Sequence, residues 1–313
     1  MPNRRNLVIV RAGNGSLHPG WLNAPGEERN WDLVVNYFGD DPDKFRGDEW
    51  LRIDGKGPKL RGLYEFIRGH EQLVRNYEYI WLAEDDLACK CRDINRLFDI
   101  CHQENLKLVQ PSLTHDSYFS HAITLHNPCF RLRYTTFVEV MAPCMSSSTL
   151  WKLLPTMNEN VSGWGVDDLW SLLLAGDPDA IAILDAVQIR HTRPVGRGQL
   201  YDSLKAAGRS AWDERQELHE KYGIVRPRYW VRSAIRISGG RVKDGIRLLC
   251  LYGWGLLAVA PRLRTGWRGF PYFWLSAMFQ QVKGRRQPET TVPPASRKYE
   301  ARLPGERRGD FIP

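Results

Sequence analysis

The chain has 313 residues, of which 42% are hydrophobic and 26% charged, enough for one large folded domain with a proper core. Its six cysteines lack regular spacing and are too few for a disulfide-built fold, which favours a reducing compartment. The net charge of +8 is unevenly distributed: from Arg226 onward 18 Lys and Arg oppose 5 Asp and Glu, whereas residues 1–225 carry a net −5. Such asymmetry indicates an anionic surface as a partner.

Short apolar runs alternate with helical patterns over the first two-thirds of the chain. Apolar residues near helical spacing predict helices over residues 59–76 and 93–104. The alternation predicts an α/β fold with a largely parallel sheet and right-handed crossovers. The predicted strands are residues 7–11, 32–38, 79–83, 106–110, 137–142 and 181–187.

Residues 226–286 are basic and rich in tryptophan. Their longest apolar run, 246–260, is shorter than the about 20 residues that a spanning helix needs, so we expect it to lie in a membrane interface. Burial against the preceding domain is the alternative. The tryptophans lie in apolar runs without a nucleic-acid-binding motif, so no nucleic acid is expected as a partner. We predict three parts: a catalytic domain (1–225), this helical membrane-associating extension (226–286), and a disordered tail (287–313) without apolar periodicity.

The hydrophobic run that starts at Tyr79 leads directly into three carboxylates, Glu84, Asp85 and Asp86. Adjacent negative charges repel one another, so a buried set needs a cation. Strand ends in open α/β folds line the ligand crevice, where carboxylates with phosphate oxygens suit Mn²⁺ or Mg²⁺. The alternative is an acidic loop that caps the next helix.

A second motif places two glycines around Trp164 and two carboxylates, Asp167 and Asp168, at the start of an apolar helix. The glycines permit close backbone approach, and the helix dipole favours anions at this end. One carboxylate facing a cavity would take a proton from an acceptor hydroxyl. Alternatively, both are ordinary charges in a first helical turn.

His191 follows the last predicted strand, downstream of both carboxylate motifs. A lone histidine is commonly a surface or core residue. Its place at a strand end favours a metal ligand instead.

The order of these motifs resembles that of inverting GT-A glycosyltransferases such as the beta-1,4-galactosyltransferases: an acidic metal motif, then Gly-Trp-Gly-x-acid-acid, then a metal-binding histidine. Most of residues 5–200 also resemble the family called domain of unknown function 707, which is considered GT-A-like. In that family the acidic triplet is usually all aspartate, whereas this chain has Glu84 first. The matching stretches are residues 11–13, 16–18, 31–37, 56–59, 79–87, 117–125, 137–143 and 163–167.

The resemblance implies a GT-A, Rossmann-like mixed sheet with helices on both faces, plus the C-terminal basic helical extension. It implies roles for individual residues. The metal ligands would be Asp86, Glu84 and His191, with Asp85 on the metal or the sugar nucleotide. The general base would be Asp167, or Asp168 by the galactosyltransferase pattern. The nucleotide pocket would contain Arg11, Asp32, Asn36 and Lys59. The acceptor would contact Trp164 and Glu139.

We therefore expect a Mn²⁺- or Mg²⁺-dependent, inverting glycosyltransferase that moves a sugar from a nucleotide-sugar donor to a glycan or lipid-linked acceptor, as in surface polysaccharide synthesis. Residues 7–10 are too short for a signal-peptide core, so we expect a cytoplasmic protein held at the inner face of the membrane. Two alternatives stay open: a metal-dependent hydrolase of a phosphate ester or nucleotide sugar, and a GT-A-like module that binds without turnover.

Overall fold

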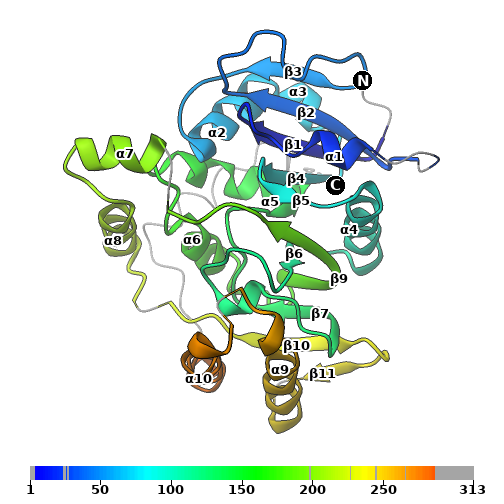
Figure 1. Cartoon of the computed structure of the whole chain (residues 1–313), viewed down its shortest axis with the longest axis vertical. Coiled ribbons are helices and arrows are strands. Elements are labelled where there is room, and N and C mark those ends of the chain that lie inside the picture. Colours follow the sequence, from blue (N-terminus) through cyan, green and yellow to red (C-terminus); the bar gives the residue numbers. More distant parts are fainter. Residues whose placement is uncertain are drawn as a thin grey trace, which may run out of the picture.

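The computed structural model describes residues 4–285 apart from residues 24, 25, 27, 197, 198, 226, 244 and 265; the expected disordered tail lies outside the described residues. Eleven strands form one mixed sheet that runs the length of the molecule (Figure 1). The strands are β1 (Asn6–Ala12), β2 (Trp31–Tyr37), β3 (Leu51–Asp54), β4 (Tyr79–Glu84), β5 (Leu87–Ala88), β6 (Leu108–Leu113), β7 (Phe130–Thr135), β8 (Cys144–Ser146), β9 (Ile181–His191), β10 (Val231–Arg236) and β11 (Arg241–Lys243).

The strand order is β11-β10-β7-β9-β6-β8-β4-β1-β2-β3, and β5 pairs with β9. Parallel pairing joins β3, β2, β1 and β4, and also joins β6 to β9. The other pairs are antiparallel, so the sheet is less parallel than the sequence predicts. Every residue of β1 and β2 is buried, as expected for parallel strands covered on both faces.

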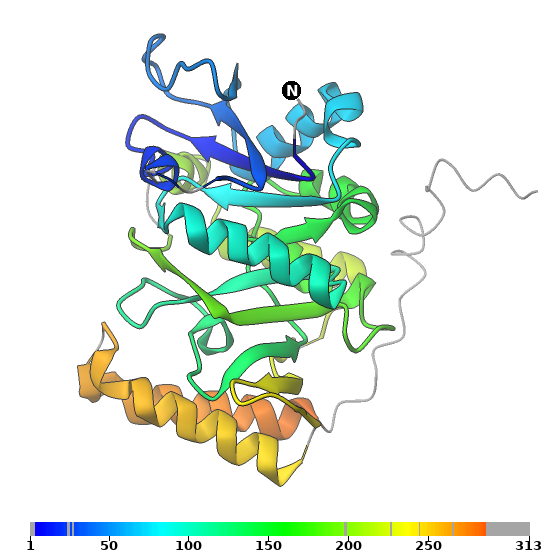
Figure 2. The same cartoon turned by 90° about the vertical axis from the view of Figure 1, so that its right-hand side faces the viewer.

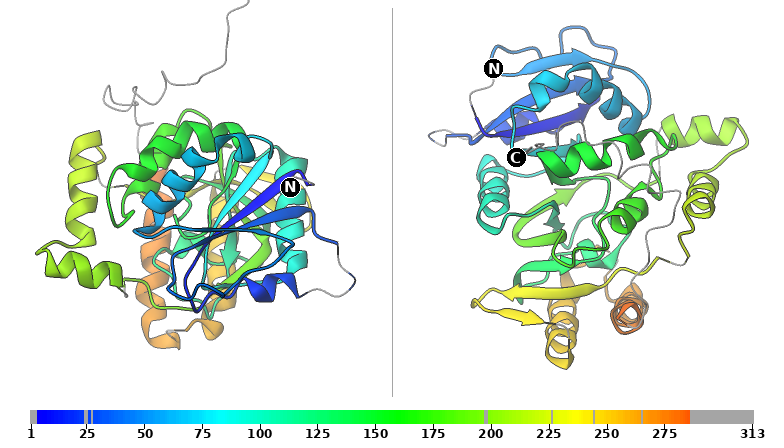
Figure 3. Two further views of the ribbon diagram at one scale, coloured as in Figure 1. Left: turned by 90° about the horizontal axis from the view of Figure 1, so that it is seen from above. Right: turned by 180° about the vertical axis from the view of Figure 1, so that it is seen from behind.

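Helices cover both faces of the sheet: α4 packs on one face, and α2, α5 and α6 on the other (Figures 1 and 2). Seen from above, α7 and α8 stand outside the layer that α5 and α6 form (Figure 3). The α-helices are α1 (Pro19–Leu22), α2 (Lys59–Gly69), α3 (Glu71–Val74), α4 (Cys91–Glu104), α5 (Ser147–Leu153), α6 (Val166–Leu173), α7 (Gln199–Ala206), α8 (Ala211–Tyr222), α9 (Ile246–Val259) and α10 (Gly266–Gly284). Short 3-10 helices are η1 (Ala122–Thr124), η2 (Leu154–Asn158) and η3 (Ala260–Arg262).

Two large hydrophobic clusters lie on the opposite faces of the sheet because side chains alternate along each strand. Val8 and Val10 of β1 point to the cluster beneath α4, which includes Phe98. Leu7 and Ile9 point to the other cluster, beneath α2, α5 and α6. The α/β architecture and its two helical layers agree with the sequence prediction.

Residues 137–142 form a buried loop, so the strand predicted there is wrong. The backbone of this loop is satisfied largely by side chains rather than by a regular ladder. Gln110 Oε1 accepts from the Glu139 amide at 2.7 Å, and the Trp81 indole donates to the Ala142 carbonyl at 3.0 Å. Pro143 has no amide hydrogen to continue a ladder. The hydrophobicity of the segment therefore reports burial and not strand structure.

The expected boundary at residue 225 does not end the sheet. β10 and β11 extend the sheet beyond β7, so residues 226–286 are not wholly helical. The predicted helix 59–76 is likewise divided into α2 and α3 at His70. Among the described residues, every helix falls short of the length and apolarity that crossing a bilayer demands.

Candidate active site

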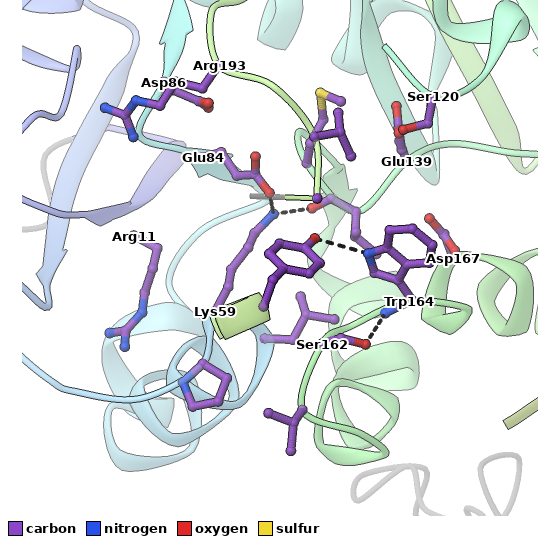
Figure 4. A pocket seen from close by; sticks show the side chains of 18 of the residues that line it. Arg11, Lys59, Glu84, Asp86, Ser120, Glu139, Ser162, Trp164, Asp167 and Arg193 are labelled. Carbon is purple, nitrogen blue, oxygen red and sulfur yellow. Dashed lines mark hydrogen bonds and ion pairs between the residues drawn. The ribbon is translucent and has the colours of Figure 1, made fainter. Parts of the chain in front are cut away.

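The carboxyl ends of β1, β4, β6 and β9 lie at one edge of the sheet, where open α/β folds bind ligands. A cavity of about 1090 Å³ opens there. Ten of the twelve predicted site residues line this cavity, and Asp32 and Asn36 do not. Lys59 and Glu84 lie on one side of the cavity, and Glu139, Trp164 and Asp167 on the other (Figure 4).

Glu84, Asp86 and His191 form a cluster whose ligand atoms all lie within 4.8 Å of one another. His191 Nε2 is 3.1 Å from Asp86 Oδ2 and 3.7 Å from Glu84 Oε2. Pairing of β5 with the end of β9 sets His191 opposite Leu87 and brings the histidine to the acidic turn. Residues separated by more than a hundred positions thus meet at one point.

The main chain orients the His191 ring. The Tyr118 carbonyl lies 2.9 Å from Nδ1, and a carbonyl can only accept, so Nδ1 carries a hydrogen and Nε2 faces the carboxylates. Burial alone would lower the pKa of His191, but the hydrogen bond and charge of Asp86 raise it to about 9. At neutral pH the His191 ring therefore carries a positive charge beside the carboxylates of Glu84 and Asp86.

The cluster fits a small divalent metal. Asp86 is only 5% exposed, and its Oδ1 is buried without a hydrogen-bond partner among the residues that the structure describes. A buried carboxylate oxygen without a partner is costly, and a cation would satisfy it. Two carboxylates and one imidazole with room for phosphate oxygens suit Mn²⁺, and Mg²⁺ would need more oxygen ligands from the substrate.

Asp85 points away from this cluster, which corrects the expectation that it could bind the metal. Its Oδ2 accepts from the Gly13 amide at 2.8 Å, and its Oδ1 pairs with Arg193 Nη1 at 2.8 Å. Burial raises the pKa of Asp85, while the Gly13 amide and Arg193 oppose that rise. Asp85 therefore fixes the β1 loop and holds a cation at the mouth of the cavity.

Arg11 and Lys59 put two cations on the wall beside the strand ends. Lys59 Nζ is 2.7 Å from Glu84 Oε1. Arg11 donates to Asn36 Oδ1 at 2.6 Å and to the carbonyls of Gly55 and Gly57. Burial lowers the pKa of Arg11 to about 10, so the guanidinium stays charged at neutral pH.

Two residues expected in the nucleotide pocket, Asn36 and Asp32, do not line the cavity. Asn36 supports the Arg11 guanidinium from behind the cavity wall. Asp32 lies at the amino end of β2, opposite the cavity, where it binds Arg4 at 2.9 Å and the Tyr77 hydroxyl at 3.1 Å. The expectation for Asp32 is wrong because it lies at the other end of its strand.

The two neighbouring carboxylates of α6 have different surroundings. Asp168 Oδ2 is 3.0 Å from Arg215 and 2.8 Å from His219, and its Oδ1 accepts from Tyr229 at 2.6 Å. Burial favours the neutral acid, but the hydrogen bonds from His219 and Tyr229 and the charge of Arg215 lower the pKa of Asp168. Both carboxylate oxygens of Asp168 are therefore held by side chains of Arg215, His219 and Tyr229.

Asp167 has no cationic partner among the described ion pairs. Its Oδ1 accepts from the Asp168 amide at 3.0 Å, and the residue lines the cavity. Burial, and then the charges of Asp168 and Glu139, raise the pKa of Asp167 well above its usual range. The preceding Gly163 and Gly165 have φ angles of +80° and +84°, which favour glycine and set the entry of α6.

Glu139 is a second carboxylate held in the loop that replaces the predicted strand. Burial raises the pKa of Glu139 to about 7, and the charge of His191 opposes the rise. Its Oε2 has no hydrogen-bond partner in the described part of the chain. Two carboxyl groups whose pKa values are raised by burial thus line the cavity together with Glu84, Asp86 and His191.

Aromatic side chains form the wall opposite the cations. The Trp164 indole donates to the Tyr201 hydroxyl at 3.1 Å. Tyr229 stacks on Phe137 with 4.0 Å between ring centroids and shares the cavity with Trp212. Flat apolar rings beside hydrogen-bonding groups suit a ligand with an apolar face and polar edges.

Several residues that line the cavity, or that contact its lining as His219 does, were not predicted from the sequence. Arg193, two positions after His191, could have been found from that proximity. Arg215 and His219 are one helical turn apart on α8, a spacing that predicts a shared face but not an aspartate opposite it. Tyr229 lies in an irregular segment and has no sequence signal.

The chain matches no protein-family model, and a search of curated proteins returns no significant match. The resemblance to the domain of unknown function 707 family and to the galactosyltransferases therefore stays a prediction. The function is therefore inferred from the geometry of the cavity.

Proposed function

We propose that the protein is a metal-dependent glycosyltransferase that moves a sugar from a nucleotide-sugar donor to an acceptor hydroxyl. The observation that carries the proposal is the Glu84, Asp86 and His191 cluster, which shares one cavity with Asp167. Among the described residues, one Asp86 oxygen has no hydrogen-bond partner and Asp167 has no ion-pair partner. A metal site and a separate base are the two elements that a metal-dependent sugar transfer by single displacement uses.

Each side of the cavity has a task in this reaction. Glu84, Asp86 and His191 would hold Mn²⁺ or Mg²⁺, which neutralises the diphosphate leaving group. Arg11 and Arg193 line the same cavity and would bind phosphate oxygens through charge-assisted hydrogen bonds.

Asp167 accepts the proton of the acceptor hydroxyl. Burial and neighbouring charges raise its pKa, so its ionised carboxylate is more basic than that of an exposed aspartate, and this ionised form accepts the proton. The acceptor oxygen forms a bond to the anomeric carbon as the bond to the phosphate oxygen breaks, and the electron pair leaves with the diphosphate. This single displacement inverts the anomeric carbon.

The first test is a thermal-shift titration with nucleoside diphosphates, with and without Mn²⁺. A ligand at one hundred times its dissociation constant stabilises the native state by about 2.7 kcal/mol. We expect a Mn²⁺-dependent shift with one nucleotide that Asp86→Asn abolishes. Asp43→Asn is the matched control, since the Asp43 side chain is 92% exposed and lies outside the cavity.

No shift with any nucleotide in the wild-type protein would contradict the proposal and favour a non-catalytic module. A positive result is followed by product analysis of the responding nucleotide sugar with and without candidate acceptors. Release of free sugar at the same rate in both cases would identify a hydrolase instead.

A further inference from the structure

Helices α9 and α10 lie side by side at one end of the molecule (Figures 1 and 2). The inner face of α9 packs firmly against the sheet edge through Leu248, Tyr252 and Leu256, which are at most 2% exposed. Gln281 of α10 bonds both the amide and the carbonyl of Val231 at 2.8 Å. The helical hairpin of α9 and α10 is thus a fixed part of the fold, and the face that it turns away from the sheet is always exposed.

That outer face is apolar. On α9, Ile246, Trp254 and Leu257 are 78%, 66% and 41% exposed. On α10, Tyr272, Leu275 and Phe279 are 83%, 61% and 57% exposed and recur at helical spacing. We call these six residues the hairpin face. An exposed apolar surface of this kind indicates an interaction site, because soluble surfaces rarely gather so many large apolar side chains.

The segment that carries the hairpin face has charges of a single sign. Residues 246–285 contain six Lys and Arg and no Asp or Glu. Arg247 begins α9 and Lys283 ends α10, while Arg262 and Arg264 follow the turn between the helices, and all four are exposed. Cations therefore lie at both ends of the apolar surface.

We propose that the hairpin face docks on an anionic lipid bilayer, with both helices in the plane of the interface. The 14 residues of α9 measure about 21 Å, less than the about 30 Å hydrocarbon core, so the helix has the length to lie in a leaflet and not to span it. Tryptophan and tyrosine prefer the headgroup level, and each cation near an anionic surface adds to binding.

A second copy of the chain fits this surface less well. A two-fold dimer through the hairpin face would bring cations from both copies together without an acidic residue from either helix pair to oppose them. Anionic headgroups supply that missing charge, whereas the acyl chains receive the apolar side chains.

Docking would also set the position of the candidate site. Arg264 donates its amide to the His115 carbonyl at 3.1 Å, and its guanidinium lies 3.8 Å from the Tyr118 ring centre. The Tyr118 carbonyl in turn holds His191 Nδ1. A short chain of direct contacts thus joins the hairpin to the cavity. The inference goes beyond the proposed transferase activity and does not depend on it.

The test is co-sedimentation of the whole protein with phosphatidylcholine vesicles with and without phosphatidylglycerol. We expect binding only when phosphatidylglycerol is present, and a fall in affinity of about tenfold or more in Trp254→Glu and in Leu275→Glu. Val225→Glu is the matched control, because Val225 is 76% exposed and belongs to neither helix.

The electrostatic part has its own pair of variants. Arg247→Gln with Arg262→Gln should weaken binding about thirtyfold, at about fivefold for each charge lost. Arg92→Gln with Arg96→Gln removes the same charge from the exposed surface of α4 and should leave the affinity unchanged.

Thermal unfolding of each variant checks that it is folded. Because the substituted side chains are exposed, we expect unfolding temperatures close to that of the wild-type protein. Equal binding to neutral vesicles, no binding to either kind, or an equal loss in the control variants would overturn the proposal. So would a dimer in solution that Trp254→Glu dissociates, because a second copy would then cover the face.

Discussion

Exchanging the two adjacent aspartates of α6 for asparagine, one at a time, should give opposite outcomes. In Asp168→Asn the charge that faces Arg215, His219 and Tyr229 is lost, while the guanidinium stays partly buried. Removing one partner of a buried, hydrogen-bonded ion pair costs about 3–5 kcal/mol. That is a large share of the about 5–15 kcal/mol that keeps a domain folded.

Asp167→Asn should leave the stability unchanged or slightly raised. Because the folded state raises the pKa of Asp167, it binds a proton more tightly than the unfolded chain does. Ionising this group as the pH rises above its unfolded pKa therefore costs folding free energy, and a neutral amide avoids the cost. If Asp167 is the base, transfer should fall by about 10²–10⁴-fold while nucleotide binding is retained.

Urea unfolding measures both stabilities, and the double variant Asp168→Asn with Arg215→Met supplies the control. Removing the unpaired guanidinium should recover part of the loss, since the cost comes from leaving a charge without a partner. Equal stabilities of the Asp167→Asn and Asp168→Asn proteins would refute the distinction drawn between the two carboxylates.

Three further predictions concern the fold. Gly62→Ala should destabilise the fold by about 1–3 kcal/mol, because a Cβ there would lie 2.6 Å from the guanidinium carbon of Arg11. Gly69→Ala on the same helix places its Cβ in open space and should stabilise the fold by up to about 1 kcal/mol. Urea unfolding measures both changes. Asp185→Asn should cost about 3–5 kcal/mol, and less when combined with Arg133→Met, because both side chains are fully buried; calorimetry would measure each. Burial lowers the pKa of His18 to about 4, so its neutral ring gives stability above pH 6.5 that is lost as pH falls towards 4, at up to about 1.4 kcal/mol per pH unit. His18→Gln should flatten that slope in denaturation measured across this range, and an unchanged slope would contradict the assignment.

Strands of the parallel part of the sheet could be predicted from the sequence because they are buried on both faces and form unbroken apolar runs. β1 and β4 are of this kind. The peripheral strands could not: β10 carries arginines, and β11 has three residues, too few for a pattern. The loop at 137–142 is the opposite case, since its buried apolar residues resemble a strand while side chains satisfy its backbone.

Much of the candidate cavity was predictable because its carboxylates follow strand ends or open a helix, places where polar residues gather at a functional edge. The different roles of Asp167 and Asp168 were not. They depend on Arg215, His219 and Tyr229, which come from α8 and from an irregular segment beyond it. Sequence spacing says nothing about which of two neighbours such distant residues will meet.

The acidic triplet shows how far local geometry can settle such a choice. Glu84 and Asp86 flank Asp85 where β4 ends and the turn to β5 begins, and this turn, rather than strand alternation, sets where the three side chains point. The structure places the first two with His191 and turns Asp85 towards Gly13 and Arg193. A glutamate at position 84, where the resembling family usually has aspartate, keeps a carboxylate beside Asp86 and His191 and also reaches Lys59. The departure from an all-aspartate triplet is therefore compatible with a metal site, whereas the same exchange at Asp85 would disturb the clamp on the β1 loop.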